Sequence, residues 1–146
     1  MVGTSNIIDG MNVLRLVLIE PGTTLRAQVG DDIYLPESPG PSLFNGATTK
    51  GIVISQRDGR PNGERLGTAN LQAKCYGGSA GYDGAKAVAR AFVDRIRNAH
   101  STDTAAGRYI SGLVESTGQL LTEPETSPAW KYELVFATVR TGPITE

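Results

Sequence analysis

The sequence predicts an α+β fold: a mostly antiparallel β-sheet with two main helices packed on one face, plus a protruding β-hairpin. Two observations predict this class. Segments with helical periodicity occur near the start and in the middle of the chain, and alternating apolar and polar residues mark strands between and after them. The length of 146 residues fits a single domain, residues 1–146, with one core.

The first third of the chain predicts helical structure followed by a short strand. Apolar residues at spacings of three and four predict a helix over Ile7–Ile19, which Pro21-Gly22 ends. Thr24–Val29 predicts a short second helical turn, and Ile33–Leu35 predicts a short strand. The next segment, Pro36–Gly51, holds three of the eight prolines together with Ser, Asn and Gly, and predicts a long loop.

Two alternating segments then predict the hairpin. Gly51–Asp58 and Ala69–Tyr76 have the composition and alternation of strands. The connection between them, Gly59–Gly67, is polar and rich in glycine, as expected for a protruding tip.

The second half of the chain predicts a long helix and two further strands. Ser79–Ala99 carries a continuous apolar stripe at helical spacing, and Ser101–Ala106 predicts a small polar loop after it. Tyr109–Ser116 predicts a strand, Thr122–Ala129 a turn-rich loop, and Trp130–Arg140 a long final strand. One face of this last strand becomes apolar only in its C-terminal half, so we expect the strand to run into a covered zone.

Composition narrows the classes of function. The net charge is −1, from 14 basic and 15 acidic residues, and Lys and Arg form no run. Because phosphate contacts supply most of the affinity of nucleic-acid readers, we expect no sequence-specific nucleic-acid binding. The apolar runs are too short to cross a bilayer and no signal-peptide pattern is visible, so neither membrane insertion nor secretion is predicted. The single cysteine predicts neither an intrachain disulfide nor a cysteine-based zinc site.

The glycine-rich stretch Gly77–Gly84 is the most tempting candidate for chemistry. It follows a predicted strand and opens a predicted helix, where phosphate-binding loops occur. Its spacing matches neither the Walker motif nor the dinucleotide-binding motif. We therefore expect a flexible strand-to-helix turn, with Ser79 or Asp83 as the helix cap. A small ligand-binding domain that uses this turn remains the alternative of a different class.

No other group of residues predicts catalysis. Cys75 lies on the apolar face of its strand, and the single histidine, His100, is expected at the far end of the following helix. Asp31 and Asp32, like Glu123 and Glu125, lie in turn-rich segments without calcium-loop spacing and are expected to be solvated. The sequence thus predicts a protein that is not an enzyme and has no catalytic, cofactor-binding or metal-binding residues.

Two sets of residues are candidates for interaction. Trp130 and Tyr132 begin the last strand, and they either pack in the core against a helix or anchor an interface. The predicted hairpin carries charged residues that either are solvated or form ion pairs between subunits: Arg57, Arg60, Glu64 and Arg65. A glycine-rich hairpin holds itself together poorly, which favours a partner.

The layout of these elements resembles that of the tail terminator, or tail completion, proteins of long-tailed (siphovirus-type) bacteriophages. The resemblance covers about Val13–Arg140 and is a pattern of elements without a catalytic signature. Neither the Gly59–Gly67 connection nor the Pro36–Gly51 loop can be matched position by position. The segments that carry the resemblance are Leu25–Tyr34 (LRAQVGDDIY), Ile52–Ser55, Ala69–Ile96 and Trp130–Arg140.

The resemblance implies a structural virion protein of the tail and neck, assembled in the host cytoplasm. Such subunits form a hexameric ring that caps the tail tube and joins the tail to the head. The implied partners are sister copies, the tail tube protein and the head-completion (stopper) protein of the neck, with no cofactor and no membrane. Genome DNA can pass through the lumen of such a ring. A head-completion or connector protein of the same neck is the related alternative.

Overall fold

The computed structural model describes residues 10–35, 45–59, 67–123 and 130–142, with residues 57–59 and 67 described by their backbone alone. Within these residues the α+β class is confirmed. The elements in chain order are α1 (Gly10–Leu18), α2 (Thr24–Val29), β1 (Ile33–Tyr34), β2 (Lys50–Gly59), β3 (Gly67–Gly77), the 3₁₀ turn η1 (Gly78–Ala80), α3 (Gly81–Asn98), β4 (Thr102–Thr104), β5 (Gly107–Thr122) and β6 (Lys131–Gly142).

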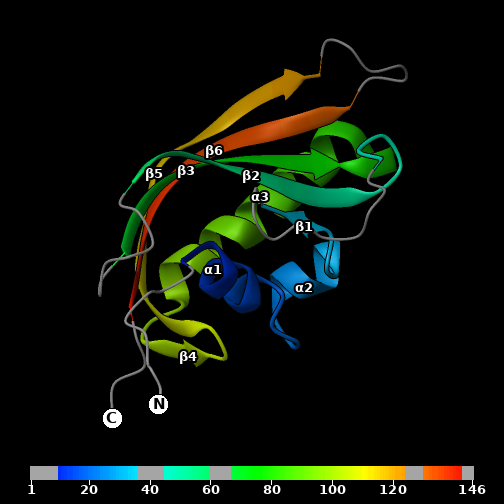
Figure 1. Ribbon diagram of the computed structural model, residues 1–146. Helices are drawn as coiled ribbons and strands as arrows, with labels where there is room; N and C mark the ends of the chain where they lie inside the picture. The colour runs from blue at the N-terminus through cyan, green and yellow to red at the C-terminus, as the bar shows by residue number, and fades with distance from the viewer. Residues whose placement is uncertain (1–9, 36–44, 60–66, 124–129, 143–146) are drawn as a thin grey trace.

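The described strands form one six-stranded sheet in the order β1-β2-β3-β6-β5-β4. Only β1 and β2 run parallel, and every other neighbouring pair is antiparallel. The sheet curls around the helices, which all lie on its concave side (Figure 1). The prediction of a mostly antiparallel sheet with its main helices on one face is therefore confirmed, and the opposite face of the sheet carries no described helix.

Helix α3 is the centre of the packing. Its apolar stripe is buried against β3, β6 and β5, and Phe92 and Ile96 are fully covered. Asp83 in its first turn and Arg97 in its last have the signs that the helix dipole favours. Arg95 also ties α3 to α1, because its Nε donates to the carbonyl of Val17 at 3.0 Å.

The core lies between this helical layer and the alternating residues of the strands. Leu71, Ala73 and Cys75 of β3 face the helices, as the alternation in the sequence predicts, and all three are buried. Burial raises the pKa of the Cys75 thiol far above its ordinary value, because the thiolate would lose its hydration. The thiol is therefore packing material and not a nucleophile.

The turn between β3 and α3 depends on glycine for close packing. A Cβ on Gly77 would overlap the carbonyl oxygen of Gly81 and the amide of Ala85, and Gly78 has a φ of +61°. The prediction that Ser79 or Asp83 caps the helix is wrong. No side chain caps α3, and Ala80 before it has helical dihedrals where a capping residue would be extended. Gly81, with a φ of +62°, separates η1 from the helix.

Three expectations about element boundaries need correction. The predicted loop Ser101–Ala106 contains β4, which pairs with the start of β5 across a two-residue turn. Strand β5 does not end at Ser116 but continues to Thr122 through Gly118. Its polar middle lacks strand alternation, and pairing with β6 holds it in place. Of the predicted loop Pro36–Gly51, residues 36–44 lie outside the described residues, and Lys50-Gly51 already belongs to β2.

Candidate interaction surfaces

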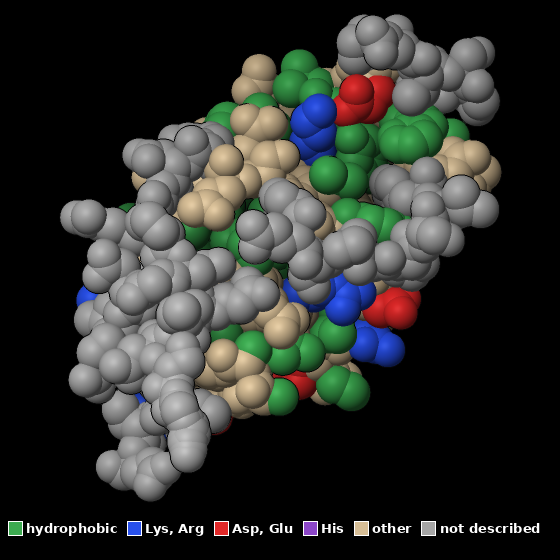
Figure 2. Space-filling model, viewed as in Figure 1, with side chains coloured by type: hydrophobic (Ala, Val, Ile, Leu, Met, Phe, Trp, Pro, Cys, Tyr) green, Lys and Arg blue, Asp and Glu red, His purple; other side chains and the backbone are tan. Residues whose placement is uncertain are grey.

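Three aromatic residues cluster where β5 ends and β6 begins, on the face of the sheet away from the helices. The Tyr76 ring lies edge-on to Trp130, with ring centroids 5.6 Å apart, and tilted against Tyr132 at 5.3 Å. Gly46 fits against this cluster, because a Cβ there would lie 2.9 Å from both Trp130 and Tyr76. Figure 2 shows hydrophobic side chains gathered in the upper part of the view, next to basic and acidic side chains. We call Tyr76, Trp130 and Tyr132 the aromatic cluster.

The carboxylate of Glu123 binds both Lys74 and Tyr76 at the aromatic cluster. Lys74 Nζ forms an ion pair with Glu123 Oε1 at 2.9 Å, and the Tyr76 hydroxyl donates to the same oxygen at 2.8 Å. The hydrogen bond from Lys74 lowers the pKa of Glu123, although partial burial opposes it. Burial and the Glu123 carboxylate together raise the pKa of Tyr76. Glu123 is thus a partnered structural residue, so the expectation that it is a solvated turn residue is wrong; Glu125 lies outside the described residues.

The structure rules out packing against a helix for Tyr132, and the interface role of Trp130 and Tyr132 stays a prediction. Along β6, Val135 and Val139 point into the core and Tyr132 points to the opposite face. Packing against a helix is therefore excluded for Tyr132, which is 7% exposed and covered by its aromatic neighbours. Trp130 precedes β6 and is half-buried beside Tyr76.

The hairpin residues are tested only in part. Arg57 lies in β2, where the backbone is described, and Arg60, Glu64 and Arg65 lie outside the described residues. Their role in contacts between subunits stays a prediction.

The outer edge of β5 is the feature that sequence reasoning missed. Of the described residues, only β4 and Ser101 bond this edge, and they reach no further than Ile110. From Ser111 to Thr122 the strand is paired with β6 on one side and faces no described strand on the other. This stretch has no proline and one charged residue, Glu115. We call it the β5 edge.

The opposite side of the sheet has a second open edge. Strand β1 pairs only with Ile52 and Val53, so β2 faces no described strand on its outer side from Ile54 to Gly59. We call this stretch the β2 edge. A backbone N–H or C=O in an exposed edge can pair with another strand, and soluble proteins usually blunt such edges with Lys, Pro or very short strands.

The face of the sheet between these edges is partly apolar. Leu113 is 65% exposed and is the one large apolar side chain with that exposure among the described residues. Leu134 and Phe136 are half-buried on the same face, and the row Ser55–Gln72–Phe136–Ser116 crosses it from β2 to β5.

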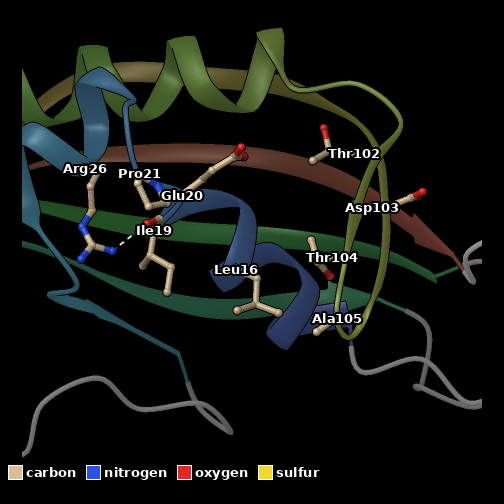
Figure 3. A pocket seen from close by; sticks show the side chains of 9 residues that line it. All are labelled: Leu16, Ile19, Glu20, Pro21, Arg26, Thr102, Asp103, Thr104 and Ala105. Atoms are coloured by element: carbon tan, nitrogen blue, oxygen red, sulfur yellow. Dashed lines mark hydrogen bonds between the residues drawn. The ribbon is translucent and has the colours of Figure 1, made fainter.

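Two grooves flank the helical layer. The first, of about 360 Å³, lies between the end of α1 and the β4 turn, with Leu16, Ile19, Pro21 and Ala105 as its apolar part (Figure 3). Its charged residues are already engaged. Arg26 donates to the carbonyl of Ile19 at 2.7 Å, Glu20 pairs with Arg95, and Asp103 pairs with Arg108 at 2.6 Å. The groove therefore offers contact area without a free acid–base pair.

The second groove, also about 360 Å³, lies between α3 and β5 and is lined by Lys86, Arg90 and Arg97 above the buried Glu133. Glu133 is 7% exposed, and its Oε2 accepts hydrogen bonds from the Thr117 hydroxyl at 2.7 Å and the Gly118 amide at 3.1 Å. Both donors belong to the irregular stretch of β5 between Ser116 and Gln119. The carboxylate thus fixes the shape of β5 next to its open edge.

The described residues include neither a candidate metal site nor a candidate membrane helix. Among the described residues, no three His, Cys, Asp or Glu side chains lie close enough to hold a metal ion. Within the same part of the chain, no helix has the length and apolar character needed to cross a bilayer. Comparisons with known protein families, with well-described proteins and with solved structures found no match.

Proposed function

We propose that this chain is a structural subunit that assembles side by side with copies of itself into a ring. By its sequence layout, the ring is of the tail terminator type: it caps a tail tube and joins it to the neck of the filled head. The observation that carries this proposal is the β5 edge, a long and nearly uncharged strand edge that faces no described strand.

The reason is the free energy of unpaired backbone groups. Water hydrogen-bonds the backbone N–H and C=O groups of an open edge, and another strand can take its place. A long open edge without lysine favours such strand pairing. The partly apolar sheet face, with Leu113 exposed, adds area that a neighbour can cover. Together these surfaces favour an assembly subunit over a self-contained domain.

The packing of the Gly77–Gly84 turn argues against the ligand-binding alternative. Gly77 and Gly78 are buried against the chain's own backbone, at Gly81 and at Thr49-Lys50. The glycines bring the strand and the helix together, and this use accounts for their presence without a bound phosphate.

Mass and imaging of the purified full chain test the proposal. We expect light scattering to give an integral multiple of the 15.4 kDa subunit mass, and negative-stain images to show rings. A monomer at every concentration up to the millimolar range, with and without tube protein, would contradict it.

Gene deletion separates the tail terminator from the head-completion alternative. In a virus that encodes this chain, loss of a terminator is expected to give headless tails of uncontrolled length. Loss of a head-completion protein is expected to leave tails of normal length beside heads that do not retain their genome.

A further inference from the structure

We propose that the β5 edge of one copy pairs, antiparallel, with the β2 edge of the next copy, so that the sheet continues from subunit to subunit. This inference rests on the proposed ring and names its interface. Both partners are edges of the same sheet that face no described strand, and each is the kind of surface that the other completes.

The direction of the strands is right for this contact. Strands β2, β3, β6 and β5 alternate in direction across the sheet. A copy placed next to β5 in the same orientation therefore presents its β2 antiparallel to β5. The junction would repeat the geometry that already joins β2 to β3.

The two edges also lie at the same level of the sheet. Pairing connects Ser55 through Gln72 and Phe136 to Ser116. A second row runs from Asp58 through Asn70 and Thr138 to Leu113. Both rows imply one register, in which Ser116 meets Ser55 and Leu113 meets Asp58 of the next copy. The contact thus needs no slip along the strands.

A second copy in this arrangement explains both edges at once. Pairing of two β5 edges about a twofold axis would cover β5 but leave the β2 edge of each copy open. Head-to-tail pairing covers the β2 edge and residues 112–117 of the β5 edge. A head-to-tail interface closes into a ring when its rotation permits. Arg57, predicted from the sequence to contact a neighbour, lies within the β2 edge that this arrangement buries.

Paired cysteines test the junction. Ser55 and Ser116 are exposed, and within one chain three strand spacings, about 14 Å, separate them. A disulfide requires Cα atoms closer than about 7 Å, so the double variant S55C/S116C can form one only between copies. Cys75 is fully buried and does not compete. Q56C/V114C is the second pair, because a third row runs from Gln56 through Leu71 and Ala137 to Val114.

The control is S55C/S111C, which has the same residue types on the same two strands. In the proposed register Ser111 lies five residues, about 17 Å, from the position that faces Ser55. After mild oxidation, we expect S55C/S116C or Q56C/V114C to give a ladder of covalent oligomers that ends at the ring size, and the control at least tenfold less. Mixing S55C with S116C should give only covalent dimers.

Each outcome decides the matter. Covalent homodimers of S116C, with no S55C–S116C heterodimers in the mixture, would show twofold β5 pairing and overturn the inference. If the wild-type chain forms rings and both double variants assemble under reducing conditions, but neither variant cross-links on oxidation, the inference is overturned and the proposed function still stands. A wild-type chain that never assembles would overturn the proposed function as well.

Discussion

Gly77 shows how one missing Cβ fixes the joint between sheet and helix. The atoms it would meet belong to the backbone of Gly81 and Ala85, which cannot rotate away as a side chain could. The glycine stretch that resembles a phosphate loop in the sequence is therefore a packing device. Its composition alone does not distinguish the two uses, because close approach to a ligand and close approach to the chain itself both require glycine.

The variant Gly77→Ala is expected to lower the free energy of unfolding by about 3 kcal/mol, the upper end of the usual cost of overpacking, since a buried overlap forces the backbone to move. Urea denaturation followed by Trp130 fluorescence measures the change. Gly22→Ala is the matched control, because a Cβ at Gly22 meets nothing within 4 Å and only its φ of +87° is strained. An equal loss in both variants would contradict the packing role.

The tyrosines predict a loss of stability in alkali. Burial, with the hydrogen bond to Asp32 second, raises the pKa of Tyr34 to about 12, and burial also raises the pKa values of Tyr76 and Tyr109. In the unfolded chain each tyrosine ionises near its ordinary pKa of about 10. Their contribution to stability is therefore complete below about pH 10 and is lost as the pH rises towards and beyond 12.

Absorbance of tyrosinate at 295 nm checks this expectation. The native protein should ionise only a minority of its five tyrosines by pH 11, while the chain in denaturant ionises most of them. Native and denatured titration curves that coincide would contradict the burial of these hydroxyl groups.

At the scale of elements, the aromatic cluster joins the ends of three strands through one carboxylate. Lys74 lowers the pKa of Glu123, so the Glu123 carboxylate contributes fully to stability above the ordinary glutamate pKa of about 4.3. That contribution is lost as the pH falls through the lower value in the folded state. Glu123→Gln should therefore be less stable than wild type at pH 6, and the difference should shrink by pH 2–3.

Denaturation at both pH values measures the stability difference between wild type and Glu123→Gln. The fluorescence of Trp130 reports it, because Trp130 lies in the aromatic cluster. Asp94→Asn, an exposed carboxylate on α3, serves as the control. A difference between wild type and Glu123→Gln that stays constant between pH 6 and pH 2 would contradict the role of the ion pair.

Several elements could be predicted from the sequence because local pattern and tertiary packing agree there. The apolar stripe of α3 and the alternation around Cys75 each place one set of side chains in the core. The second half of β5 could not be predicted, since Ser116–Gln119 is polar and includes Gly118, and its strand conformation comes from β6 and Glu133. Nor does alternation in β6 reveal which face the helices cover, because both faces carry apolar residues.

Some candidate surfaces can be predicted from residue type, and others depend on the order of the strands in the sheet. Residue type pointed to Trp130 as a contact residue, because large aromatic side chains are common in interfaces. Open strand edges have no signature in residue type, since they depend on which strands end up last in the sheet. The β5 edge therefore became visible only with the pairing order.

At the scale of the whole molecule, Leu113 links the exposed sheet face to assembly. Leu113→Glu should leave the fold intact, because the side chain is 65% exposed. It should weaken assembly at least tenfold, since covering a leucine contributes more than about 1.4 kcal/mol. In the proposed register the new carboxylate also faces Asp58 of the next copy, and like charges on opposite strands oppose pairing.

Sedimentation of the variant over a concentration series gives the apparent dissociation constant. Ala27→Glu, which adds the same charge at an exposed position of α2, is the matched control and should assemble like wild type. Equal weakening in both variants would show that net charge, and not the position of Leu113, governs assembly.

The width of the sheet sets a dimension for any assembly built by extending it. Four strands, β2, β3, β6 and β5, would each add about 4.8 Å to the circumference, so one subunit contributes about 19 Å. Six subunits, the number that the resemblance implies, then give a backbone circle about 37 Å across before strand tilt widens it. One subunit more or fewer changes that diameter by about 6 Å, so the measured diameter of the ring would give the number of its subunits.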